Sequence, residues 1–216
     1  MSAVPLFVAA ALALACSACT RGPAGPVPAA GSPAGTVATT AATASGAVDA
    51  ALPPGALVEL VPVPAELPEG LSPLPDGAGP LDVRAVAELD GDPAATLKTL
   101  QRTGFRDGYS AAYTDADTGA FVSVVVLRFE TGQGSRDAFA QQMGPLRASR
   151  EPLALVSIGD ESAAWREQAT DGDVAQTVTV RFRVRELTWW VSAGGFAAAD
   201  LGVASDVAAR LARRTS

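Results

Sequence analysis

The two cysteines are the residues whose spacing could carry chemistry. Cys16 and Cys19 lie in ALALACSACT, residues 11–20. A C-x-x-C pair can perform redox chemistry at the start of a helix in a βαβ fold, or supply two of four zinc ligands. This pair instead lies between an apolar leader and a tract of proline, glycine and alanine, and the chain has no histidine and no third cysteine. The spacing therefore favours neither a redox site nor a zinc site.

The residues before Cys16 indicate a membrane address. Val4–Ala15 is apolar and uncharged; it is shorter than the roughly 20 residues of a transmembrane helix but suits the core of a signal peptide. Leu12-Ala13-Leu14-Ala15-Cys16 resembles the lipobox of bacterial lipoproteins, and the chain is similar in general form to actinobacterial members of that group. The resemblance implies cleavage before Cys16, acylation of its thiol and an anchor at the outer face of the cell membrane. Cys19 is the alternative acylation site, and an uncleaved signal anchor is the alternative topology.

Composition divides the chain into four parts. Residues 1–15 are the predicted signal peptide, and residues 16–51, rich in Pro, Gly, Ala, Ser and Thr, are a predicted disordered tether. Residues 52–81 are proline-rich but contain Leu and Val, so we expect an extended segment that packs on the domain, with a short edge strand near 57–63. Residues 82–216 are expected to form a single α+β domain.

Charge and residue usage exclude several classes of function. The chain has 23 acidic and 16 basic residues, a net charge of -7, which argues against a nucleic-acid partner. Without histidine, and with no cysteine in the domain, the usual general base and nucleophile pairs are missing. Acidic pairs such as Asp115 and Asp117 fall in predicted turns, where aspartate is favoured for local reasons. We therefore expect no enzyme activity, no metal and no cofactor.

Helix and turn signals predict the order α-ββ-α-ββ(β)-α. Asp92 and Pro93 begin a first helix that ends before Gly104, and the Asp115–Gly119 turn closes a hairpin. Ser135 is the expected cap of a second helix, and a last helix covers about 198–213. The expected fold is an antiparallel sheet of about five to six strands packed with about three helices.

Two hairpin registers predict which side chains share a face of the sheet. A turn at Asp171-Gly172 places Trp165 opposite Val178, and a turn at Arg185-Glu186 places Val180 opposite Val191. Both registers then leave one face to a set of polar and aromatic residues: Arg166, Thr177, Thr179, Arg181, Arg183, Thr188 and Trp190.

This face is the candidate ligand or partner surface. Arg166, Arg181 and Arg183 beside Trp190 could hold an anionic or sugar-like ligand through charge-assisted hydrogen bonds and stacking. The alternative is a solvated or helix-covered face, with arginine stacked on tryptophan and paired to carboxylates such as Glu167.

The sequence thus predicts a non-enzymatic, lipid-anchored envelope protein that displays a small binding or scaffold domain. Its partners would be the membrane, through the lipid anchor, and an unknown envelope protein, glycan or small ligand. One alternative is a small-molecule or lipid carrier, which requires a closed apolar cavity of several hundred cubic ångströms between sheet and helices. Another is a hydrolase that uses carboxylates alone, which requires two acids facing each other within about 10 Å.

Overall fold

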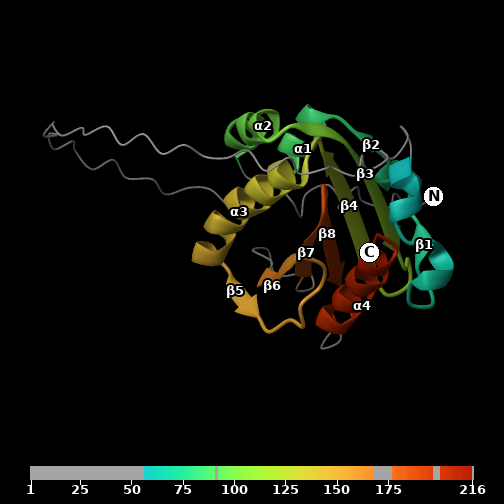
Figure 1. Ribbon diagram of the computed structural model, residues 1–216. Helices are drawn as coiled ribbons and strands as arrows, with labels where there is room; N and C mark the ends of the chain where they lie inside the picture. The colour runs from blue at the N-terminus through green and yellow to red at the C-terminus, as the bar shows by residue number, and fades with distance from the viewer. Residues whose placement is uncertain (1–55, 91, 168–176, 197–199, 216) are drawn as a thin grey trace, which may run out of the picture.

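The computed structural model describes residues 56–90, 92–167, 177–196 and 200–215, and their centre is an antiparallel sheet (Figure 1). The strands are β1 (Ser72–Pro73), β2 (Gly79–Leu81), β3 (Phe105–Thr114), β4 (Phe121–Phe129), β5 (Glu151–Leu153), β6 (Glu161–Glu167), β7 (Thr177–Val184) and β8 (Leu187–Gly194). Their order is β1-β3-β4-β8-β7-β6-β5, with β2 also paired to β3. The α+β class and the antiparallel sheet agree with the prediction, but the sheet has eight strands rather than five or six.

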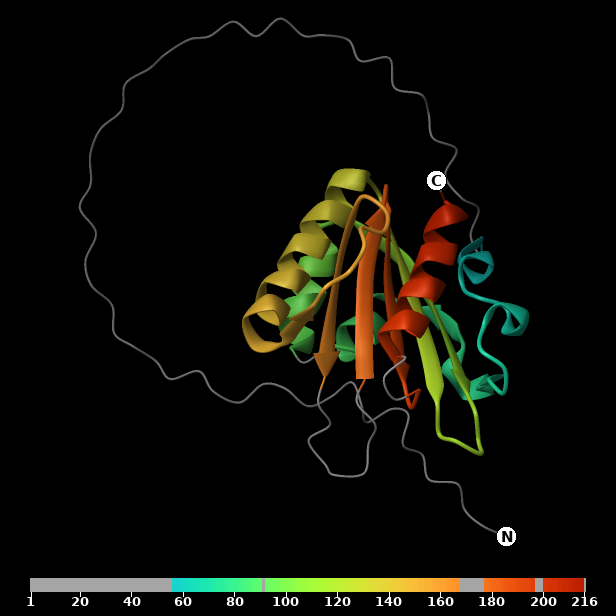
Figure 2. The ribbon, with the colours of Figure 1, turned by 90° about the horizontal axis from the view of Figure 1, so that it is seen from below.

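The helices cover both faces of the sheet. They are α1 (Val83–Glu88), α2 (Pro93–Arg102), α3 (Gly132–Ser149) and α4 (Asp200–Arg213), with short 3-10 helices η2 (Ala56–Leu60), η3 (Pro64–Glu66) and η4 (Pro75–Gly77). Figure 2 shows α2 and α3 on one side of the strands and α4 on the other. The described residues therefore contain more helices than the three expected. The prediction missed α1 and the 3-10 helices because these segments are too short to show a helical period in the sequence.

The face under α4 is the main apolar core. Phe182 and Trp189 are fully buried there, with ring centroids 4.8 Å apart and planes parallel to within 2°. Helix α4 adds Ala204, Ala208 and Leu211, which are buried against the sheet. Alternate residues of β7 and β8 point to this side, as the period of two requires.

Local signals explain most helix and turn positions. The Asp92 carboxylate accepts a hydrogen bond from the Ala95 N–H at 3.1 Å, which confirms the predicted cap of α2. The Asp115–Gly119 turn joins β3 to β4 as predicted, and Gly119 has a φ of +74°.

The start of α3 differs from the prediction. The helix begins at Gly132 rather than after Ser135, and the Thr131 hydroxyl accepts from the Gly134 N–H at 3.0 Å. Ser135 lies inside the first turn, where its hydroxyl donates to the carbonyls of Gly132 and Arg185. A serine that can bond the preceding turn need not be the cap.

The proline-rich segment joins the domain along β3 and α4. The edge strand expected near 57–63 is wrong: a 3-10 helix, η2, occupies Ala56–Leu60, and the strand pairs come later, at β1 and β2. Leu57 and Leu60 are buried in the main core, and the Trp189 indole N–H donates to the Leu60 carbonyl at 3.2 Å. Prolines within the segment interrupt any longer strand.

Some predictions fall outside the described residues. Cys16, Cys19, the leader, the tether and the Asp171-Gly172 turn all belong to this group. Within the described ranges, no helix combines the length and the apolar character needed to cross a bilayer.

Candidate functional site

Arg181 lies between two tryptophans on the face of the sheet that α3 covers. Its guanidinium carbon is 4.1 Å from the centroid of the Trp190 ring and 5.3 Å from that of Trp165. Only 8% of Arg181 is exposed. Its Nη1 donates to Oε1 of Gln142, a buried side chain of α3, at 3.5 Å. The arrangement is a buried cation held mainly by aromatic faces.

Burial lowers the pKa of Arg181 to about 10, since leaving water disfavours the charged guanidinium. The carboxylates of Asp90 and Glu167 act in the opposite direction and raise this pKa, while Arg150 lowers it further. Three buried polar atoms on this side lack a hydrogen-bond partner among the described residues: Arg181 Nε, Gln142 Nε2 and Thr188 Oγ1. The part of the α3 side around Arg181 is therefore polar and costly, although two smaller apolar clusters, around Phe129 and around Phe139, lie on the same side.

The observed register between β6 and β7 differs by one residue from the predicted register. Trp165 lies opposite Thr179 rather than Val178, so its ring shares the α3 side with Arg181. Arg166 lies opposite Val178 and belongs to the α4 side, where burial raises the pKa of Asp200 and the charge of Arg166 opposes part of that rise. Arg166 was predicted to share a face with Arg181, Arg183 and Trp190, but it lies on the opposite face of the sheet. The pairing of β7 with β8 confirms Val180 opposite Val191.

The remaining predicted surface is covered by a helix. Arg181, Arg183 and Trp190 are all buried, and Arg181 stacks on Trp190 as the helix-covered alternative expects. Of the two alternatives that the sequence left open for these residues, the burial of Arg181, Arg183 and Trp190 agrees with the helix-covered face.

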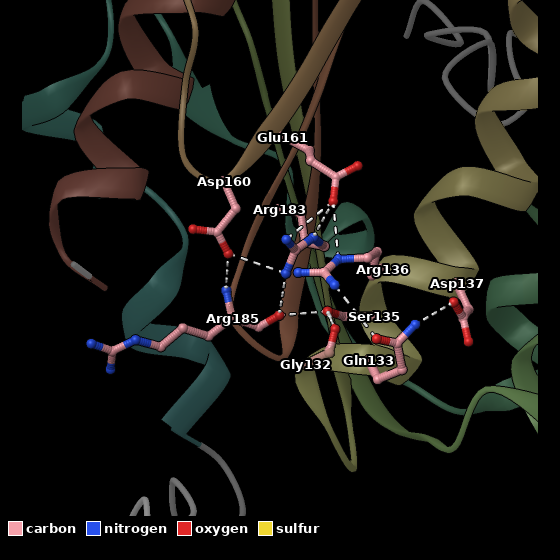
Figure 3. Close-up of polar contacts among 9 residues, drawn as sticks. All are labelled: Gly132, Gln133, Ser135, Arg136, Asp137, Asp160, Glu161, Arg183 and Arg185. Atoms are coloured by element: carbon pink, nitrogen blue, oxygen red, sulfur yellow. Dashed lines mark hydrogen bonds and ion pairs between the residues drawn. The ribbon is translucent and has the colours of Figure 1, made fainter. Parts of the chain in front are cut away.

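Arg183 is the centre of a separate ion-pair network at the β7–β8 turn (Figure 3). Its Nη1 lies 3.1 Å from Asp160 Oδ2 and its Nη2 lies 3.1 Å from Glu161 Oε1. The side chain of Arg183 is 4% exposed, so the two carboxylates compensate a charge that is almost out of water. Arg136 of α3 approaches Glu161 from the other side at 3.6 Å. The network ties β6, the turn and α3 together, which is a structural role.

Gly159 allows the chain to approach this network closely. It forms an isolated bridge with Arg183, and the Asp160 N–H donates to the Arg183 carbonyl at 2.8 Å. Gly159 has a φ of +64°, and a Cβ there would lie 2.4 Å from the Arg183 oxygen. Only glycine fits this position.

Two pockets lie next to Arg181 and the side chains that contact it, Trp165, Trp190 and Gln142. The first, of about 220 Å³, lies at the sheet edge and includes Trp165, Arg150 and Met143 in its lining. The second, of about 90 Å³, is lined by Asp90, Ala95, Thr96, Thr99, Gln141 and Gln142. Trp165 and Gln142 both contact Arg181, and each lines one of the two pockets.

Acidic side chains near these sites pair with arginines. Glu167 accepts hydrogen bonds from Arg150 Nη1 and, at 3.1 Å, from the Trp165 indole N–H. Asp107 pairs with Arg128 across β3 and β4. Among the described residues, no group of three or more Cys, Asp or Glu is placed to hold a metal ion.

Sequence reasoning missed Arg150 and Gln142. Both come from the α3 region, and nothing in their local sequence marks them. Their importance follows from where α3 lies on the sheet, which only the tertiary structure shows.

The comparisons with known proteins are few. No protein-family model and no curated protein matches the sequence. The extracellular domain of PknH from Mycobacterium tuberculosis is a solved structure with a similar fold, at a TM-score of 0.51 and 10% sequence identity. The match covers 72% of this chain and 94% of that domain. At this identity the likeness shows the fold alone.

Proposed function

We propose that this protein is a lipid-anchored component of the bacterial cell envelope whose α+β domain binds a ligand or partner outside the cell membrane. The observation that carries the proposal is the combination of a lipobox-like Cys16 with a fold similar to an extracellular domain of a mycobacterial protein. Acyl chains on Cys16 hold the chain at the outer leaflet, and residues 16–51 separate the domain from it.

A binding role agrees with the arrangement of charged groups. Asp107, Glu161 and Glu167 are each paired with an arginine side chain, whereas a carboxylate-only hydrolase needs two acids that converge on one substrate bond. A carrier needs a closed cavity larger than either described pocket, at about 220 and about 90 Å³. A pocket at the edge of the sheet, next to the buried polar groups around Arg181, suits recognition at the surface better than enclosure of a lipid.

Acylation can be tested by replacing each cysteine separately. Wild-type protein, Cys16→Ala and Cys19→Ala are expressed in an actinobacterial host that processes lipoproteins, and the cells are fractionated. Wild type and C19A are expected in the membrane fraction with the mass of acyl chains added, and C16A is expected to lose both properties. Retention of C16A in the membrane with an unchanged mass would contradict acylation at Cys16.

A further inference from the structure

The pocket at the sheet edge exists because β5 is short. Strand β5 pairs with β6 only from Glu151, opposite Arg166, to Leu153, opposite Ala164. Pro152 has no N–H to donate to a longer ladder. The chain leaves the sheet after Leu153, so Ser162 and Ala163 of β6 lie beyond the end of β5 and line the pocket.

The lining is mostly apolar, with one charged side chain and the hydroxyl of Ser162. The lining comes from the end of α3, from the β5 region and from β6. It consists of Met143 in α3, Arg150 just before β5, Pro152 and Leu153 in β5, Leu155 after it, and Ser162, Ala163, Ala164 and Trp165 in β6. Arg150 is the one charged side chain in that lining, and it is about three-quarters buried. A pocket with apolar walls and one fixed polar group is the usual form of a small-molecule site.

The positive charge at this pocket is greater than its lining alone suggests. The Trp165 ring has Arg150 at 5.8 Å from its centroid and Arg181 at 5.3 Å. Glu167 meets Arg150 and also accepts from the Trp165 indole, so one carboxylate serves two groups. The burial that lowers the pKa of Arg181 also means that a nearby negative group would favour its charged form.

The volume sets the size of an occupant. A water molecule takes about 30 Å³ of liquid volume, so a pocket of about 220 Å³ holds about seven groups of that size. This corresponds to a small molecule of six to eight non-hydrogen atoms, on the order of one short acyl chain.

We propose that this pocket binds a small free monocarboxylate with an apolar body, whose carboxylate meets Arg150 and whose hydrocarbon part packs on Leu153, Leu155 and Met143. A guanidinium has five N–H donors in a planar fork, and a carboxylate accepts from two of them at once. The ligand carboxylate competes with Glu167 for this fork, and the apolar walls supply the remaining affinity. The inference deepens the proposed binding role of the domain.

The test uses the full chain with Cys16→Ala and Cys19→Ala, so that binding is measured apart from anchoring. Hexanoate is titrated against ¹⁵N-labelled protein, with hexanamide as an uncharged molecule of the same shape and acetate as the carboxylate without a body. Hexanoate is expected to saturate with a dissociation constant on the order of 1 mM, a value that suits so few atoms. Hexanamide and acetate are each expected to bind at least tenfold more weakly, and the Trp165 indole signal is expected to shift while that of Trp189, on the other face, stays.

Three substitutions in that same chain locate the site. Arg150→Gln is expected to weaken hexanoate about tenfold and to leave hexanamide unchanged, because only the charge–charge contact is lost. Ala163→Leu fills the pocket and is expected to abolish both. Arg136→Gln replaces an exposed arginine of α3 that is outside the pocket lining; it is the matched control and is expected to bind as the parent does.

The outcomes separate clearly. No saturable shift with hexanoate, equal affinity for hexanoate and hexanamide, or an unchanged affinity in R150Q would each overturn the proposal. The R150Q and hexanamide comparisons do not depend on A163L folding. Because the chain used cannot be acylated, a negative binding result does not affect the conclusion on acylation. A negative acylation result likewise does not affect the conclusion on binding.

Discussion

The guanidinium of Arg181 lies 4.1 Å from the ring centroid of Trp190, beneath α3 and almost out of water. In this position the guanidinium has lost most of its hydration, and it contacts two aromatic rings and, weakly, Gln142 instead. The relationship shows that the α3 side of the sheet is built differently from the apolar core under α4. It also implies that the charge of Arg181 costs stability, while its bulk provides packing.

Replacing Arg181 separates charge from bulk. Arg181→Met keeps an unbranched side chain between the tryptophans and removes the buried charge, so its free energy of unfolding is expected to equal or exceed that of wild type by up to about 1 kcal/mol. Arg181→Ala leaves a cavity and is expected to lose about 2–4 kcal/mol. Urea unfolding measures both; a loss of more than about 2 kcal/mol in R181M would mean that the charge itself stabilises the fold.

Gly159 offers a test of the close approach at the Arg183 network. Gly159→Ala places a Cβ 2.4 Å from the Arg183 carbonyl oxygen at a φ of +64°, and is expected to cost more than about 2 kcal/mol. Gly119→Ala has a similar φ of +74° but open space around its Cβ, so only the backbone strain of about 1 kcal/mol remains. Equal losses in the two variants would show that the steric contact has no effect.

The fold was predictable where local signals and burial agree. The Arg185-Glu186 turn joins two strands whose alternate residues are apolar, and its register was correct through Val180 and Val191. The register of β6 was one residue off because it relied on a turn signal alone, and Trp165 changed faces as a result. Strands β1 and β2 consist of two and three residues rich in Pro and Gly, and their pairing depends on β3, far along the chain.

The candidate site was less predictable than the fold. Cationic and aromatic residues on β7 and β8 were placed on one face correctly, but the helix over them could not be inferred from their spacing. The edge pocket arises where β5 leaves β6 after Leu153, which is a tertiary feature without a sequence motif.

Trp189 is expected to hold residues 56–67 of the proline-rich segment against the sheet. Trp189→Phe keeps the stacking partner of Phe182 but removes the hydrogen bond to the Leu60 carbonyl, at an expected cost of about 1–3 kcal/mol. Hydrogen exchange is expected to rise in residues 56–67. Trp165→Phe is the control, because its indole donates to the partly exposed Glu167 on the other face of the sheet, and it should leave exchange in that segment unchanged.

Acid should weaken the contact between Glu66 and Arg214. The hydrogen bond from Arg214 holds the pKa of Glu66 below its usual 4.5, so the unfolded chain takes up a proton at a higher pH than the folded one. This contribution to stability is full above pH 4.5 and disappears as the pH falls through the lowered pKa. It is expected to stay below about 1 kcal/mol, because the pair is partly exposed.

Glu66→Gln should reveal that dependence. The stability difference between wild type and E66Q, measured by urea unfolding from pH 7 to pH 3, is expected to be constant at neutral pH and to shrink in acid. A difference that grows as the pH falls would contradict the assigned direction.

The most direct test of the central claim is mass spectrometry of the N-terminal peptide of the mature protein from its native envelope. The account predicts a chain that begins at position 16, with a diacylglycerol thioether on that cysteine. A peptide that spans positions 15 and 16 with a free thiol would contradict it.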